Sequence, residues 1–198
     1  MVSLVGSTGF LGRHVLEELL TKDFDIWLGI RLNTRKDKLA YINNIKTLNP
    51  TKVTIFTLDI LEKESWQNCL KDSDCIIYCI SIWSSKESDH LSEDLFIEVE
   101  GFLTMLNAIK ELQIKRMILP GSLSNVLNGK YRPVYTESHW SDPSFCDKSE
   151  QAKLLIEKCA WNFQSQQSHL FKLTVFLSGA LFGSFDEIDW DSYSLSLI

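Results

Sequence analysis

The first twelve residues contain the feature that most restricts the fold: a short apolar run leads directly into three regularly spaced glycines. Residues 2–5 read Val-Ser-Leu-Val, and the glycines follow at positions 6, 9 and 12. Beyond the first two glycines, Leu11, Val15 and Leu19 recur at the spacing of one helix face. A buried strand, a glycine turn and an amphipathic helix are therefore predicted in that order.

Each glycine of this turn is expected to have a separate physical role. Gly6 permits the tight turn, Gly9 lets the backbone approach a phosphate group, and Gly12 lets the helix pack closely on the strand. The N–H groups and the positive end of the helix would then face an anion. This order of parts predicts a dinucleotide-binding turn. The other predicted cofactor contacts in the turn are Thr8, Phe10 and Leu11.

The rest of the chain alternates between apolar runs of strand length and segments of helix length. Strands are predicted at 2–5, 25–31, 52–58, 74–80, 115–121 and 172–177. Helices are predicted at 10–22, 35–47, 62–71, 91–112 and 147–166. This pattern is typical of an α/β protein with a doubly wound, Rossmann-type parallel sheet covered by helices on both faces. The irregular stretch 122–146 is expected to be a functional loop, because loops of that length in a domain usually are.

Composition and charge argue against several classes of function. The 198 residues fit one domain, and a net charge of -6 without a basic stripe argues against a nucleic acid partner. No apolar run is long enough to span a membrane, and the first strand leaves no room for a signal peptide, so a cytoplasmic location is expected. The five cysteines lack CxxC and metal-ligand spacing, which predicts reduced thiols and no metal site.

The end of the second predicted strand indicates which cofactor the turn selects. NAD-binding chains usually have an acidic residue there, which accepts hydrogen bonds from the adenosine ribose. This chain has Arg31 instead, followed by Arg35, Lys36 and Lys38. A guanidinium with ammonium groups nearby favours the 2′-phosphate of NADP, so NADP(H) is the expected cofactor. A solvated basic patch is the alternative interpretation of these residues.

The end of the third predicted strand is a second candidate for the adenosine side of the site. Asp59 and Ile60 follow that strand and are placed to border an adenine ring. An Asp at a strand end is also a common helix cap, so Asp59 by itself indicates little.

These segments, together with one further motif, resemble a known family. The motif is Val134-Tyr-Thr-Glu-Ser-His-Trp-Ser-Asp-Pro-Ser-Phe-Cys146, followed by Ile156-Glu-Lys-Cys-Ala-Trp161. The chain resembles the plant dihydroflavonol reductase and cinnamoyl-CoA reductase group of the extended short-chain dehydrogenases over residues 2–185. The resemblance implies NADPH binding and hydride delivery to a small carbonyl or acyl-CoA substrate. It also implies a catalytic Ser, Tyr and Lys, the last two in a YxxxK motif on one helix.

The catalytic set of the family is only partly matched in this sequence. Ser122 falls at the family serine, which hydrogen-bonds the substrate oxygen, and Lys153 falls at the lysine that holds the nicotinamide ribose. The tyrosine position is Ser149, which shares a helix face with Lys153 at i, i+4. An exposed helix lysine remains an alternative for Lys153. In the family, the loop after the fourth strand flanks the cofactor. Ile80 and Ser81 are the candidate cofactor contacts in this loop, and Trp83 is a possible wall of the pocket.

Ser149 determines how much chemistry is expected. Carbonyl reduction needs a proton donor beside the developing alkoxide, and a tyrosine starts from a pKa of about 10, whereas a serine is a far weaker acid. General acid catalysis contributes about 10²–10⁴ in rate, so catalysis is expected to be weak or lost unless water, Tyr131 or Tyr135 replaces the donor. A hydrolase dyad of Ser149 and Lys153 is disfavoured, because it also needs an oxyanion hole.

Members of the family continue beyond this length with a smaller substrate-binding lobe. Residues 1–185 are predicted to form the cofactor-binding domain, and 186–198 a short acidic tail in place of that lobe. Three functions stay open: an NADP-binding reductase-like protein with weak or lost catalysis, an active NADPH-dependent carbonyl reductase, and a non-catalytic interaction module gated by the cofactor. A missing lobe would expose apolar surface, which favours a homo- or hetero-oligomer.

Overall fold

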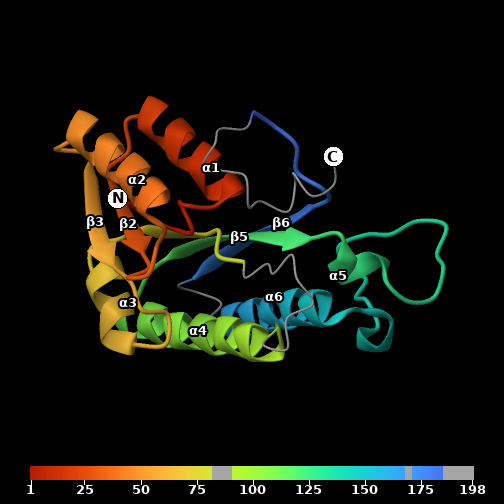
Figure 1. Ribbon diagram of the computed structural model, residues 1–198. Coiled ribbons are helices and arrows are strands. Elements are labelled where there is room, and N and C mark those ends of the chain that lie inside the picture. Colours follow the sequence, from red (N-terminus) through yellow and green to blue (C-terminus); the bar gives the residue numbers. More distant parts are fainter. Residues whose placement is uncertain (82–90, 168–170, 185–198) are drawn as a thin grey trace.

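A parallel sheet forms the centre of the protein in the computed structural model, which describes residues 1–81, 91–167 and 171–184. Within these residues the sheet has six strands in the order β3-β2-β1-β4-β5-β6, and all neighbours are parallel (Figure 1). This strand order is the predicted doubly wound Rossmann topology. The strands are β1 (Val2–Val5), β2 (Ile26–Ile30), β3 (Val53–Thr57), β4 (Cys75–Tyr78), β5 (Arg116–Ser122) and β6 (Lys172–Ser178).

Helices cover both faces of the sheet (Figure 1). On one face lie α1 (Phe10–Thr21) and α2 (Lys36–Leu48), whose Leu16 and Ile42 are fully buried against the sheet. On the other face lie α3 (Lys63–Leu70), α4 (Leu91–Leu112) and α6 (Lys148–Gln166). The three-layer arrangement therefore follows from continuously apolar strands that need cover on both sides.

Burial along the strands reflects their position in the sheet. All four residues of β1 are buried, because this strand lies in the middle of the sheet and is covered on both faces. In β6, which is the outermost strand among the described residues, Lys172, Thr174 and Phe176 are exposed and alternate with half-buried residues. Burial is therefore greatest in the middle of the sheet, where β1 lies between β2 and β4.

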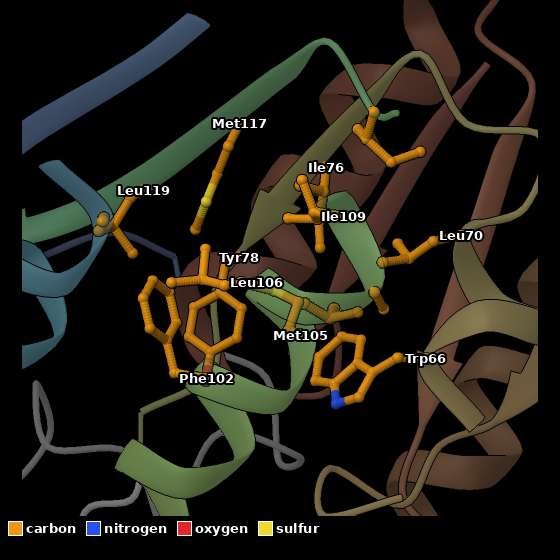
Figure 2. Close-up of a cluster of buried hydrophobic side chains, with 14 of the residues drawn as sticks. Trp66, Leu70, Ile76, Tyr78, Phe102, Met105, Leu106, Ile109, Met117 and Leu119 are labelled. Atoms are coloured by element: carbon orange, nitrogen blue, oxygen red, sulfur yellow. The ribbon is translucent and has the colours of Figure 1, made fainter. Parts of the chain in front are cut away.

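An aromatic cluster supports the carboxyl end of β4 (Figure 2). Tyr78, the last residue of β4, packs edge-on against Phe102 of α4 with ring centroids 5.1 Å apart. Trp66 of α3 is fully buried beside them and donates a hydrogen bond to the Ile60 carbonyl oxygen at 2.8 Å. These large side chains pack α3 and α4 against the sheet at the carboxyl end of β4.

The predicted strand and helix boundaries are confirmed to within two residues. The expectation of an irregular loop over 122–146 was wrong in two places, because the short helix α5 (Ser124–Leu127) and the 3-10 helix η1 (Pro143–Phe145) lie within it. At η1, the Asp142 side chain accepts a hydrogen bond from Ser144 N at 2.9 Å. Such short elements carry no periodic apolar pattern, so periodicity does not reveal them. Trp83 and the predicted tail 186–198 lie outside the described residues.

The described part of the chain also shows whether a helix could span a membrane and whether the cysteines are paired. None of the helices described there is long and apolar enough to cross a membrane. All five cysteines are free thiols.

The glycine turn brings three parts of the backbone into direct contact. Gly6 has a φ of +84°, and a Cβ there would lie 2.4 Å from the Cys79 carbonyl carbon. A Cβ on Gly12 would lie 2.1 Å from the Gly6 carbonyl oxygen. Only residues without a side chain therefore let α1 approach the end of β1 and let β1 leave the sheet beside the end of β4.

This geometry predicts opposite results for two neighbouring substitutions. Gly12→Ala should lower the free energy of unfolding by about 3 kcal/mol or more, because the added methyl group overlaps a backbone oxygen that cannot move without shifting the turn. Gly9→Ala should change it by less than about 1 kcal/mol, because its Cβ would be 3.4 Å from the Gly6 carbonyl oxygen and the backbone there is extended. Urea denaturation of both variants measures the difference, and equal losses would contradict this account of the turn.

Candidate cofactor-binding cleft and active site

The start of α1 is arranged to face an anion. Gly9 is its N-cap residue, and its N–H bonds the Gly6 carbonyl oxygen at 3.1 Å, which closes the turn. Among the described residues, no side chain caps this helix start, and its first turn has no acidic residue. The helix therefore offers its N–H groups and its positive partial charge to a ligand such as a phosphate.

A cleft of about 520 Å³ extends from this helix start along the carboxyl edge of the sheet to the first half of α6. It joins the glycine turn to the candidate catalytic residues, which are far apart in the sequence. The space beside the Gly9 Cα is free for a ligand. Apart from its neighbours in the chain, the Gly6 carbonyl oxygen at 3.4 Å is the sole described atom within 4 Å of a Cβ built at Gly9. The predicted site residues that line the cleft are Gly9, Phe10, Leu11, Gly12, Lys38, Ile80, Ser81, Ser122, Ser149 and Lys153.

Five predicted residues are not part of the cleft wall that the described residues form: Gly6, Thr8, Arg31, Asp59 and Ile60. Arg31 is exposed directly after β2, and its carbonyl oxygen accepts hydrogen bonds from the Thr34 amide and hydroxyl. Asp59 accepts a hydrogen bond from Leu61 N at 3.0 Å, and so braces its own turn. Ile60 is buried, and the absence of a side chain at Gly101 makes room for it.

The candidate catalytic residues come from two elements. Ser122 ends β5, and its Oγ lies 2.8 Å from the Ser124 Oγ and accepts a hydrogen bond from Ser124 N at 3.2 Å. Ser149 and Lys153 lie one turn apart near the start of α6, and both are partly buried in the cleft wall. The start of α6 is fixed by a capping box, in which Asp147 and Glu150 satisfy each other's backbone N–H groups.

The tyrosines considered as replacement proton donors are not brought to this cleft. Tyr131 is 88% exposed, and the wall formed by the described residues includes neither Tyr131 nor Tyr135. The Tyr135 hydroxyl donates to the Lys130 carbonyl oxygen at 3.4 Å and accepts from Arg132 N at 3.2 Å, so it serves its own loop. Neither Tyr131 nor Tyr135 therefore replaces the missing proton donor in the described cleft wall.

Six ionisable residues in the cleft wall were missed at the sequence level: Tyr78, Cys79, Glu98, Asp147, Glu150 and Glu157. Burial, and to a smaller extent the Glu98 carboxylate, raises the pKa of Tyr78 well above its ordinary value. Burial raises the pKa of Cys79 to about 12, so this side chain is a thiol at neutral pH. The i, i+4 spacing that links Ser149 to Lys153 continues to Glu157 and could have revealed it. No sequence pattern indicates that Glu98 lines the cleft, because this depends on how α4 is rotated in the fold.

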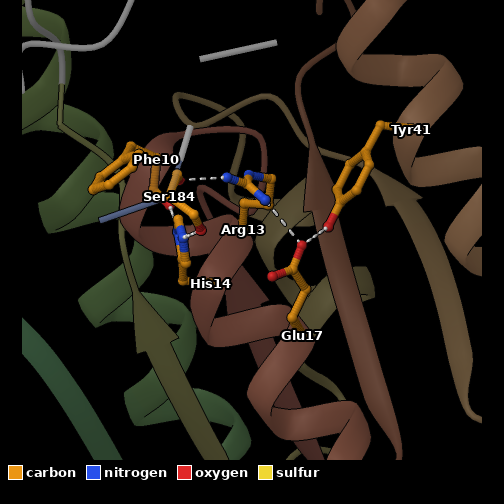
Figure 3. A network of polar contacts seen from close by, with 6 residues as sticks. All are labelled: Phe10, Arg13, His14, Glu17, Tyr41 and Ser184. Carbon is orange, nitrogen blue, oxygen red and sulfur yellow. Dashed lines mark hydrogen bonds and ion pairs between the residues drawn. The ribbon is translucent and has the colours of Figure 1, made fainter. Parts of the chain in front are cut away.

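A network of polar contacts holds the segment after β6 against α1 (Figure 3). Its residues Gly179 to Leu181 line the cleft. Arg13, which is 4% exposed, donates to the Ser184 carbonyl oxygen at 3.2 Å and to Glu17 at 3.0 Å. The Tyr41 hydroxyl also donates to Glu17, at 2.9 Å. One buried guanidinium therefore holds this segment against α1 and links it through Glu17 to α2.

Comparison with known proteins agrees with this fold. The model of the NAD dependent epimerase/dehydratase family matches residues 2–188. Similar proteins include a bifunctional dihydroflavonol 4-reductase/flavanone 4-reductase from Malus domestica, which is 22% identical over 176 residues, covering 84% of this chain and 50% of that protein. Cinnamoyl-CoA reductase 1 from Petunia hybrida is 23% identical over 168 residues, with 81% and 49% covered.

Solved structures show the same fold. Yeast methylglyoxal/isovaleraldehyde reductase complexed with NADPH superposes with a TM-score of 0.74 at 22% identity, covering 92% of this chain and 58% of that one. Vestitone reductase from alfalfa, Medicago sativa, gives a TM-score of 0.71 at 24% identity, with 89% and 55% covered.

The glycine turn, the strand order and the family match together define the class of this protein. The chain belongs to the NAD dependent epimerase/dehydratase family of NAD(P)-dependent reductases and epimerases. The resemblance to dihydroflavonol and cinnamoyl-CoA reductases is confirmed at low identity. The chain spans about half the length of the curated relatives it matches.

Proposed function

We propose that this chain binds NADP(H) in the cleft and acts as a reductase-like protein with weak or lost catalysis. The observation that carries the proposal is the continuity of the cleft, whose wall includes both the glycine turn and Lys153. A dinucleotide can span these points, with its pyrophosphate at the start of α1 and its nicotinamide near Ser122. Such a cofactor supplies a hydride when bound, and the residues of the chain supply binding and orientation.

The choice of NADP(H) over NAD(H) rests on the charges at the adenosine end. Lys38 lines the cleft, and the exposed Arg31 follows β2 where an acidic residue would accept ribose hydrogen bonds. A guanidinium offers two parallel N–H donors to a phosphate, and an ammonium adds charge. These side chains favour a 2′-phosphate, whereas they offer nothing specific to an unmodified ribose.

The proposed reaction type is hydride transfer to a small carbonyl or acyl-CoA substrate. In this reaction Ser122 would hydrogen-bond the substrate oxygen, and Lys153 would hold the nicotinamide ribose. The developing alkoxide needs a proton, and Ser149 stands where the family tyrosine would donate it. Because a serine hydroxyl is a poor general acid, we propose that cofactor binding is retained while turnover is slow.

Cofactor selectivity can be tested with two variants of the basic segment, a double substitution and a control. The double variant Arg31→Ala, Lys38→Ala should weaken NADPH binding about tenfold or more, because it removes two charged partners of the 2′-phosphate, and should leave NADH binding unchanged. Lys36→Ala is the matched control, because its side chain lies in the same segment and outside the described wall of the cleft. Fluorescence titrations with both cofactors measure these effects. An equal loss for NADH, or no loss for NADPH, would contradict the proposed selectivity.

The role of position 149 can be tested by restoring an acidic hydroxyl. Ser149→Tyr should raise the rate of NADPH oxidation with a small aldehyde by about 10²-fold, because it places a phenol one turn from Lys153. Ser149→Phe is the matched control, because it adds the same ring without the hydroxyl. Absorbance at the nicotinamide band follows the reaction. If Ser149→Phe gives the same rate as Ser149→Tyr, the proton donor lies elsewhere.

A further inference from the structure

A buried polar cluster joins α5 to α6 directly behind the cleft. Asn125 of α5 is fully buried, and its Nδ2 donates to the Glu157 Oε2 at 2.6 Å. Glu157 is 5% exposed, lines the cleft, and accepts a second hydrogen bond on Oε1 from the Trp161 Nε1 at 3.2 Å. The carboxylate is thus held from both sides by N–H donors.

The cluster contacts α6 at the residues that matter for the candidate active site. Asn125 follows Ser122 by three residues, so a short backbone connection links it to the end of β5. Its Nδ2 also lies 3.5 Å from the backbone carbonyl oxygen of Lys153. Glu157 is one helical turn beyond Lys153. One amide group therefore ties α5, which begins two residues after Ser122, to the helix that carries Lys153.

The energetics of the cluster indicate a geometric role. The Asn125 Oδ1 is buried without a hydrogen-bond partner among the described residues, which is unfavourable for a polar atom. A buried carboxylate is also unfavourable unless it is paired and hydrogen-bonded. An apolar contact between α5 and α6 would avoid both penalties, but it would let α6 shift along its own axis relative to α5. The hydrogen bonds between the amide and the carboxylate oppose such a shift, because hydrogen bonds are directional.

We propose that Asn125 is a positioning residue: through Glu157 and the Lys153 carbonyl oxygen, it holds α6 so that Lys153 stays at a fixed position relative to Ser122 in the cleft. The proposal rests on the proposed function, in which Lys153 holds the nicotinamide ribose. Asn125 touches neither cofactor nor substrate in this account, and its effect passes through Lys153.

The first test uses the cofactor-free protein, so it does not depend on NADP(H) binding. Asn125→Ala should raise the hydrogen-exchange rate of the α6 amides between residues 148 and 157 by about tenfold relative to the amides of α4. The matched control is Ser3→Ala, which removes a buried hydroxyl that donates to the Cys69 carbonyl oxygen at 2.8 Å, away from the cleft. This control should leave the ratio between α6 and α4 unchanged. An unchanged ratio in Asn125→Ala would overturn the proposal.

The second test asks whether Asn125 acts through Lys153. In a double-mutant cycle, Asn125→Ala should weaken NADPH binding about tenfold in the parent chain and less than about twofold in a Lys153→Met background. The conservative variant Glu157→Gln should keep NADPH affinity within about threefold, because its amide oxygen can take the place of Oε2 and accept from the Asn125 Nδ2, while the hydrogen bond from the Trp161 Nε1 is lost. If Asn125→Ala does not fold, Asn125→Ser takes its place. The serine side chain is smaller than that of asparagine, so it fits the same space, and it lacks the amide group.

The outcomes separate this inference from the proposed function. If NADPH does not bind the parent chain, or binds the Lys153→Met variant as tightly as the parent, the proposed function fails, and the exchange experiment still decides whether Asn125 braces α6. If NADPH binds and requires Lys153, but Asn125→Ala has the same effect in both backgrounds, the positioning role fails and the proposed function stands.

Discussion

The contact between Gly12 and the Gly6 carbonyl oxygen is the constraint on which the rest of the site depends. A Cβ at Gly12 would lie 2.1 Å from that oxygen, so α1 reaches its position only because no side chain is present. Gly6 in turn leaves room for the backbone after β4, which brings the switch point of the sheet next to the start of the helix. The cleft opens at this point, where the strand order reverses. Open parallel sheets bind their ligands at such a point. Arg13 and the capping box of α6 then fix the two ends of the same cleft.

Much of this arrangement could be predicted from the sequence, because it depends on local patterns. The glycine spacing, the apolar strands and the i, i+4 relation of Ser149 to Lys153 are all visible in short windows. Other parts depend on contacts between distant segments. The Arg13 hydrogen bond to Ser184 joins residues that are 171 positions apart, and the Asn125 contact with Glu157 spans 32 positions. No local pattern signals such pairs, and the same reason explains why Glu98 was missed and why the largely exposed Tyr131 was considered for the site.

Binding and turnover make separate demands on this cleft. An anion site needs backbone geometry and a helix end, both of which the turn from Gly6 to Gly12 provides. Hydride transfer to a carbonyl also needs a proton donor of suitable acidity, which Ser149 does not provide. The proposed loss of one function without the other follows because the two demands fall on different elements.

Isothermal titration calorimetry of the parent chain with NADPH and with NADH tests the central claim most directly, because it measures whether the cleft beside the glycine turn holds a dinucleotide and which one. The account predicts saturable binding of one NADPH per chain, with NADH at least about tenfold weaker. A titration with NADPH that releases no binding heat at several temperatures, or tighter binding of NADH, would contradict it.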